Sequence, residues 1–174
     1  TTTNLIVNAA AVTGRLGGIA AQNDGSGATA VTATGAVAAS AGTGIFANHS
    51  AGAGGLTIDA TVVSGGAHGI DARNTGGGAT RVTATGEVRG GAGGGLSVTT
   101  AGSATDITIN AVDVAGGGSD GEWRRLGGSH ASTMSAAGTV SKATGDGIAA
   151  RNIFSTTNLT IQAATVTGAG TDRK

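Results

Sequence analysis

The sequence has no cysteine, no proline and no tyrosine, and only 11% of its residues are charged. Without cysteine it can form neither a disulfide nor a thiolate metal site. Its ten basic and ten acidic residues give a formal net charge of zero, so bulk electrostatics would not attract it to nucleic acid. Its apolar runs are far shorter than the roughly 20 residues that a membrane-spanning helix needs. We therefore expect neither nucleic acid as a partner nor insertion into a membrane.

Glycine is abundant, at 35 of 174 residues, but it lacks the three-residue period and the proline of collagen. A glycine-rich chain with 2% aromatic residues is often disordered, because it cannot bury enough apolar area to offset the entropy of ordering. Here the apolar residues are largely valine, isoleucine and alanine, and they recur in a fixed order. That order favours a folded repeat.

Three series of residues recur with a common period. One is a valine at steps of 25 or 26 residues, and another is a Gly-Ile pair, with variants, at the same steps. The third is an apolar residue at steps of 24 to 27 residues. Because the three series stay in phase, chance does not explain them. The valines are Val12, Val37, Val63, Val88, Val114, Val140 and Val166.

Each unit contains three short segments in which apolar and polar residues alternate, separated by clusters of Gly, Asn, Ser and Thr. Such alternation predicts strands with one buried face, and the clusters predict turns. The sequence therefore predicts an all-β fold, a single-stranded parallel β-helix of about seven coils of about 26 residues, with three strands per coil. Two kinds of unit alternate, so the repeat is a pair of coils. Residues 1–174 are expected to form one β-solenoid domain.

Several segments resemble one known family. Residues 69–74 read Gly-Ile-Asp-Ala-Arg-Asn and residues 147–152 read Gly-Ile-Ala-Ala-Arg-Asn, while 32–37 and 83–88 share a Thr-Ala-Thr-Gly-x-Val corner. In these segments the chain resembles the passenger region of bacterial autotransporters and related secreted β-helical adhesins. The resemblance implies a right-handed helix, an extracellular or bacterial cell-surface location and a structural or adhesive role.

The two ends of the sequence are in the same phase. Residues 2–5 and 156–159 both read Thr-Thr-Asn-Leu, and neither a signal peptide nor a barrel-forming run of strands is recognisable. Neither end has a polar cap of the kind that shields solenoid edges. Two interpretations remain open: a segment of a longer solenoid, or a subunit that stacks end to end into a filament.

Asparagines recur at the corner that follows the Gly-Ile-x-Ala strand. Stacked asparagine side chains can form a hydrogen-bonded ladder along the axis. We interpret them as a structural ladder that stabilises the turn, with a polar binding stripe as the alternative. Thr100 and Leu126 interrupt it at equivalent positions. The predicted ladder consists of Asn23, Asn48, Asn74 and Asn152.

Residues 116–130 predict an irregular coil. By phase Glu122 and Arg124 fall where the other coils have core residues, and burying both charges would cost several kcal/mol. We therefore expect a one-residue bulge that turns Trp123 inward. An aromatic residue beside arginines could contact a carbohydrate or an anion, and a degenerate coil is the alternative interpretation. The candidate binding residues are Trp123, Arg124, Arg125 and His130.

No catalytic constellation is recognisable, because the acidic residues are scattered over different strands and corners and no Gly-x-Ser-x-Gly elbow is present. His49, His68 and His130 have no carboxylate at ligand spacing, so neither a metal nor another cofactor is expected. We expect a structural or adhesive segment without enzymatic activity, whose partners are surface glycans or further copies of itself. A filament subunit is the main alternative; a polysaccharide-active enzyme and an ice-binding solenoid are weaker ones.

Overall fold

The computed structural model describes residues 3–101, 105–118, 122–126, 131–144, 147–152 and 158–168, with the backbone alone for 122–126 and 150–152. Every regular element in these ranges is a β-strand, and none of them contains a helix that could cross a membrane. The strands of the first three coils are β1 (Leu5–Ala9), β2 (Val12–Gly14), β3 (Gly17–Asn23), β4 (Thr29–Ala33), β5 (Val37–Ala39), β6 (Thr43–His49), β7 (Leu56–Ala60), β8 (Val63–Gly65) and β9 (Ile70–Asn74). The strands of the later coils are β10 (Thr80–Gly90), β11 (Leu96–Thr100), β12 (Ile107–Gly116), β13 (Glu122–Leu126), β14 (Ser132–Lys142), β15 (Ile148–Asn152) and β16 (Leu159–Thr167).

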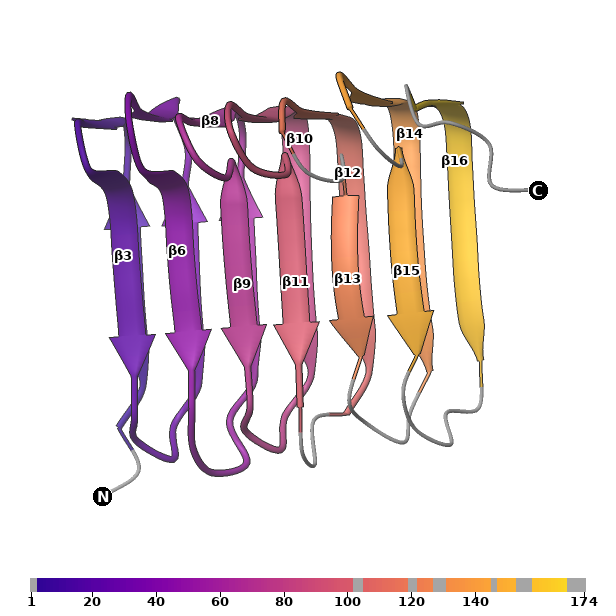
Figure 1. Cartoon of the computed structure of the whole chain (residues 1–174). Helices are drawn as coiled ribbons and strands as arrows, with labels where there is room; N and C mark the ends of the chain where they lie inside the picture. The colour runs from indigo at the N-terminus through magenta and orange to yellow at the C-terminus, as the bar shows by residue number, and fades with distance from the viewer. Residues whose placement is uncertain are drawn as a thin grey trace.

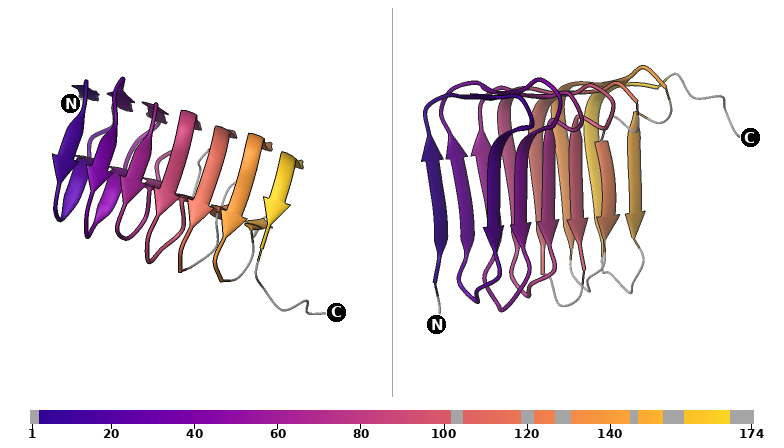
Figure 2. Two further views of the ribbon diagram at one scale, coloured as in Figure 1. Left: turned by 90° about the horizontal axis from the view of Figure 1, so that it is seen from above. Right: turned by 60° about the vertical axis from the view of Figure 1, so that its left-hand side comes forward.

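These strands form two sheets on opposite sides of a narrow core (Figure 1). The first sheet stacks β1, β4, β7, β10, β12, β14 and β16, and the second stacks β3, β6, β9, β11, β13 and β15. All pairs are parallel, and the chain passes from one sheet to the other in each coil, so the coils follow one another along the axis (Figure 2). The predicted all-β parallel solenoid is confirmed. The described residues complete six coils and begin a seventh, slightly fewer than predicted, and the handedness stays a prediction.

The corner after the first strand differs along the stack. In the first three coils it leads into separate short strands, β2, β5 and β8, which pair with one another. In the later coils the two segments join into β10, β12, β14 and β16, with a register shift at the corner, as between Ala84 and Glu87. The predicted three separate strands per coil are therefore found only in the first three coils. In the later coils the strand bends at the corner without ending, because a bulge can bend a strand without ending its ladder.

The core consists of inward residues stacked from coil to coil. In β7, Leu56, Ile58 and Ala60 are buried, and the residues between them are not. Ile58 pairs with Val31 in one neighbouring coil and with Val82 in the other, and all three are 0% exposed. Among the described side chains, apolar residues without aromatic rings thus fill the space between the sheets.

Glycines and valines of neighbouring coils touch each other, which explains why their series share one period. A Cβ atom at Gly69 would lie 2.8 Å from Cγ1 of Val88 and 2.5 Å from the carbonyl oxygen of Gly95, both in the next coil. Any side chain at this position would push the two coils apart. The same contact joins Gly18 to Val37, Gly44 to Val63, Gly95 to Val114 and Gly147 to Val166.

Coils of two lengths alternate, which agrees with the predicted two-coil repeat. A short coil advances 24 or 25 residues from its first strand to the next, and a long coil advances 27. Short coils begin their first strand with a bulky leucine or isoleucine, whereas long coils begin it with threonine or serine. These residues form one inward column in the order Leu5, Thr29, Leu56, Thr80, Ile107, Ser132 and Leu159.

Candidate functional site

The outward positions of the second sheet form its outer face, a flat surface of six adjacent strands (Figure 1). Because side chains alternate between the two sides of a strand, each strand contributes two positions to this face. The first outer column contains Ala20, Phe46, Asp71, Ser97, Trp123 and Ala149. The second outer column contains Gln22, Asn48, Arg73, Thr99, Arg125 and Arg151.

At the centre of this face, Phe46, Asp71 and Arg73 form one contact group. The Arg73 guanidinium donates to the Asp71 carboxylate from Nη2 at 2.7 Å and from Nε at 3.2 Å, and it lies 5.4 Å from the centre of the Phe46 ring. The hydrogen bond to Asp71 raises the pKa of Arg73, so this side chain stays charged. The Arg73 side chain is 54% exposed while that of Asp71 is 7% exposed. The group therefore holds a planar cation at the surface with donors still available to a ligand.

Of the four candidate binding residues, Trp123 and Arg125 fall on the outer face and Arg124 does not. The backbone register pairs Trp123 with Ser97 and Arg125 with Thr99, whereas Arg124 pairs with Val98 of the inward column. The fourth candidate, His130, lies outside the described residues. Sequence reasoning missed Phe46 and Arg73, which share these two outer columns.

The predicted bulge at residues 122–124 is wrong. Strand β13 keeps one register with β11 and with β15, so Glu122 stands opposite Leu96 on one side and Ile148 on the other. A bulge would disrupt the hydrogen-bonded ladder on both sides of this central strand. The ladder therefore places Glu122 and Arg124 at the positions that core residues occupy in the neighbouring coils.

The corner after the second sheet contains an inward polar column, and its asparagines are structural. The Asn74 side chain accepts from the backbone of Gly76 at 2.9 Å and donates to the carbonyl oxygen of Gly78 at 3.0 Å and to Thr80 Oγ1 at 2.9 Å. Asn23 makes the equivalent bonds in its own turn, to Gly25 and Gly27. These bonds close the turn, as expected for asparagine side chains at such corners.

The prediction that Asn48 belongs to the asparagine ladder is wrong. The register pairs Asn23 with His49 and His49 with Asn74, while Asn48 lies in the second outer column between Gln22 and Arg73. His49 is 0% exposed, its Nδ1 is 3.2 Å from Thr29 Oγ1, and its Nε2 has no partner among the described residues. His49, and not Asn48, therefore takes the inward position in this coil, because a shift of one residue moves a side chain to the other face of a strand.

The same column continues through Thr100, which pairs with Asn74, and it reaches Asn152 opposite Leu126. The predicted interruption by Thr100 and Leu126 is therefore confirmed at the level of the register. The corner column is thus mixed rather than a continuous asparagine ladder, and it fits turn closure better than a binding stripe.

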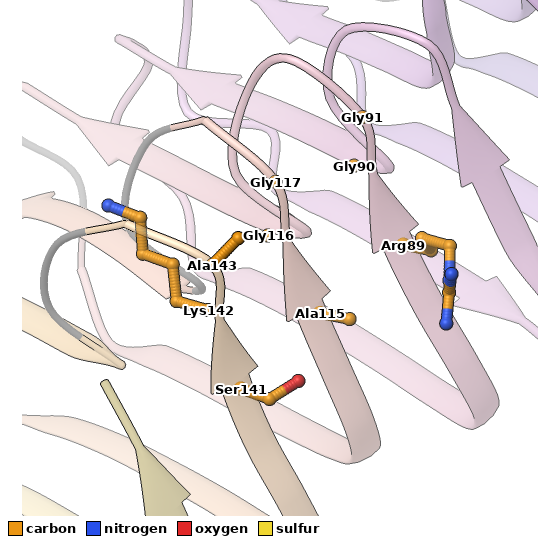
Figure 3. Close-up of a pocket in the computed structure, with 9 residues that line it drawn as sticks. All are labelled: Arg89, Gly90, Gly91, Ala115, Gly116, Gly117, Ser141, Lys142 and Ala143. Carbon is orange, nitrogen blue, oxygen red and sulfur yellow. The ribbon is translucent and has the colours of Figure 1, made fainter. Parts of the chain in front are cut away.

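A second surface feature is a shallow groove of about 430 Å³ across the corners that follow β10, β12 and β14 (Figure 3). Arg89 and Lys142 lie on opposite sides of it, and Gly90, Gly91, Gly116 and Gly117 are among the residues that line it. The Arg89 guanidinium pairs with Glu87 at 2.9 Å. The backbone amide of Gly117 already donates to Gly90 of the preceding coil at 3.0 Å, so the ladder uses a donor that a ligand would need. The groove is therefore a weaker candidate site than the outer face.

A small polar cluster lies beside the outer face at the first corner. The Ser50 hydroxyl donates to Asp24, and the Gln22 amide donates to the same carboxylate at 3.2 Å. These hydrogen bonds, with that of Ser50 first, lower the pKa of Asp24. The carboxylate is fully exposed, so the cluster joins two coils at the surface and does not form a pocket.

Metal binding and similarity to other proteins add no further assignment. Among the described residues no three His, Cys, Asp or Glu side chains are grouped as metal ligands would be. In comparisons with protein-family models, curated proteins and solved structures, no match to this chain is found.

Proposed function

We propose that this chain is an extracellular structural and adhesive β-helix segment of a bacterial surface or secreted protein. The observation that supports this most directly is the unbroken stack of parallel strands from β1 to β16. Each inner coil is hydrogen-bonded to two neighbours, so the stack resists bending and presents an extended surface of fixed geometry. A rod with a flat outer face suits adhesion, since contact with a surface needs many weak interactions in a constant arrangement.

Cell adhesion tests this proposal. The folded chain is coated on plastic, and the retention of cells under flow is compared with that on an equal density of the Val88→Asp variant. Val88 is 0% exposed, and a carboxylate there should disrupt the stack. We expect retention on the folded chain alone, and soluble folded chain should compete with it. Equal retention on both coatings, or no retention on either, would overturn the proposal.

Assembly into filaments is the second candidate function, because apolar core positions are open at the end of the described stack. Leu159, Ile161 and Val166 of β16 are 38%, 43% and 49% exposed. A second copy whose β1 stacked on β16 would cover them. Light scattering over a range of concentrations tests this: growth of mass into long particles supports filaments, and a constant monomer mass excludes them. Electron micrographs of the same samples distinguish short rods from fibres.

A further inference from the structure

The two histidines that the structure describes both lie where neighbouring coils touch. His49 ends β6 in the second coil, and its ring packs against Gly76 of the third coil, where a Cβ atom would lie 2.7 Å from Cδ2 and 2.8 Å from Nε2. His68 belongs to the third coil, and its ring packs against Gly93 of the fourth. The third coil, residues 56–79, carries β9 between β6 and β11 (Figure 1) and is thus joined to both neighbours through an imidazole ring.

The contact of His68 needs a neutral ring. Its Nδ1 accepts a hydrogen bond from the backbone amide of Gly94 at 3.1 Å. Only a ring nitrogen without a proton can accept such a bond, whereas a protonated imidazole has N–H groups at both nitrogens. A Cβ atom at Gly93 would lie 2.6 Å from Nδ1, so no water fits between this side of the ring and the turn. Protonation would therefore set two donors against each other and break this bond between coils.

The position of His49 also favours a neutral ring, because the ring is enclosed. Its side chain is 0% exposed, Nδ1 is 3.2 Å from Thr29 Oγ1, and Nε2 has no partner in the described part of the chain. The column on either side of it supplies Asn23 and Asn74, which carry no charge. A second proton on this ring would bury a positive charge without a counter-ion or water, which is costly.

The charged groups on the elements packed against these two rings are engaged elsewhere. In the coil before His49, one carboxylate is fully exposed and accepts from Ser50 and Gln22. On β9 an acid and an arginine pair with each other on the outer face, and on β10 a second such pair lies at the surface. Neither ring is hydrogen-bonded or ion-paired to any of them in the described ranges. These groups are Asp24, Asp71, Arg73, Glu87 and Arg89.

We propose that the third coil is an acid-sensitive joint of the stack, which is held on both sides while His49 and His68 are neutral and opens when they take up protons. An imidazole in an unfolded chain gains its proton below about pH 6.5. Because the folded contacts favour neutral rings, the opened chain binds more protons than the folded one, and stability rises with pH in this range. The stabilising contribution is thus present above about pH 6.5 and is lost as the pH falls below it. The joint does not depend on the adhesive function.

Hydrogen exchange followed by mass spectrometry tests this proposal on the original chain, at about pH 7.5 and about pH 5.5, which lie on either side of the imidazole titration. Rates are corrected for the effect of pH on intrinsic exchange. Each histidine should raise the opening of residues 56–79 by up to about tenfold at the lower pH, and both together by up to roughly a hundredfold. The inward residues of β12 and β14 should keep their protection, since these strands lie in later coils.

Two substitutions that the chain itself supplies remove the titrating groups. His49→Asn introduces the residue that Asn23 and Asn74 provide in the adjacent coils, and His68→Thr introduces the residue that Thr43 provides before the glycine of its own coil. The double variant should exchange at equal corrected rates at both pH values. His130 is unchanged in both chains, so its own titration cancels in the comparison.

Asp24→Asn is the matched control, because it removes the carboxylate nearest in sequence to these contacts and leaves both imidazoles in place. It should keep the full response to acid. If the double variant does not fold, the single variants decide, and each should retain about a tenfold response of the roughly hundredfold total.

Three results would overturn the inference. One is equal protection of residues 56–79 in the original chain at both pH values, and another is equal acceleration in every strand. The third is a response to acid that persists undiminished in the double variant or, where that variant is unfolded, in both single variants. A response that disappears in Asp24→Asn would assign the effect to the carboxylate and refute the role of the imidazoles.

Discussion

Replacement of Gly69 by alanine should destabilise the stack by a predictable amount. A Cβ atom there would lie 2.5 Å from the carbonyl oxygen of Gly95, 2.8 Å from that of Arg89 and 2.8 Å from Cγ1 of Val88. Ordinary contact begins near 3.4 Å, so the next coil would have to move by about 0.9 Å. The carbonyl of Gly95 accepts a hydrogen bond from the backbone of Ile70 at 2.9 Å, and this movement would stretch that bond beyond a useful length.

The expected cost follows from these contacts. Overpacking typically costs about 1–3 kcal/mol, and a lost backbone hydrogen bond adds about 1 kcal/mol. The smaller entropy of the unfolded alanine variant returns up to about 1 kcal/mol. The net loss is thus about 2 kcal/mol, which for a chain of this length lowers the Tm by roughly 4–8 °C.

Thermal unfolding followed by circular dichroism measures this change. Gly17 provides the control, because a Cβ there would meet a single neighbouring atom, the carbonyl oxygen of Thr43, at an ordinary 3.7 Å. Gly17→Ala should leave the Tm unchanged or raise it slightly. If Gly69→Ala unfolds at the same temperature as the original chain, or if both variants lose equal stability, close contact between coils does not explain the glycine series.

Three further predictions concern the corner, the surface cluster and the core. Asn74→Ala should lower the free energy of unfolding by about 1–3 kcal/mol, since buried partners lose their hydrogen bonds, whereas Asn48→Ala should change it by less than about 0.5 kcal/mol, both measured by urea unfolding. Ser50→Ala should raise the pKa of Asp24 toward its ordinary value in an NMR titration, because the first of its stabilising hydrogen bonds is removed. Ile58→Asp should unfold the neighbouring coils as well as its own, since Ile58 stacks on both sides, and hydrogen exchange should accelerate in β4, β7 and β10 together.

Each of these predictions has an outcome that contradicts it. Equal losses for Asn74→Ala and Asn48→Ala would show that the corner bonds do not stabilise the fold. The lowered pKa of Asp24 implies a stability contribution that is present above its unfolded pKa and is lost as the pH falls through its folded pKa. If the pKa of Asp24 is the same in Ser50→Ala as in the original chain, the Ser50 hydrogen bond does not provide that contribution. Faster exchange confined to β7 in Ile58→Asp would mean that the coils unfold independently.

Inward positions made the fold predictable from the sequence. An inward residue contacts inward residues of the next coil, as Gly69 contacts Val88 and as Ile58 pairs with its equivalents on both sides. These contacts restrict the residue types at such positions, so the period is visible in the sequence. The corner was less predictable, because Asn48 and His49 are adjacent polar residues and the coil length varies at the turns. Only the register shows that His49 takes the inward place.

The cost of placing charges at core positions, taken alone, predicts a bulge in β13. The ladders that β13 forms with β11 and β15 on its two sides instead keep Glu122 in register. The outer face was also missed, since outward residues face few packing restrictions and so show no period. A signal was nevertheless present: Phe46 and Trp123 both stand two residues after the glycine of the Gly-Ile series.

Alternation of short and long coils restricts how such a rod can change its length through duplication or deletion in its gene. Loss of residues 29–79 would bring Thr80 to the place of Thr29, above Leu5, and the order of bulky and small side chains would be kept. Loss of residues 29–55 alone would place Leu56 directly against Leu5. Two large side chains would then be neighbours in a column where large and small side chains otherwise alternate. The segment that can be gained or lost without disturbing the stack is therefore a pair of coils. Relatives of different length should differ by multiples of about 51 residues.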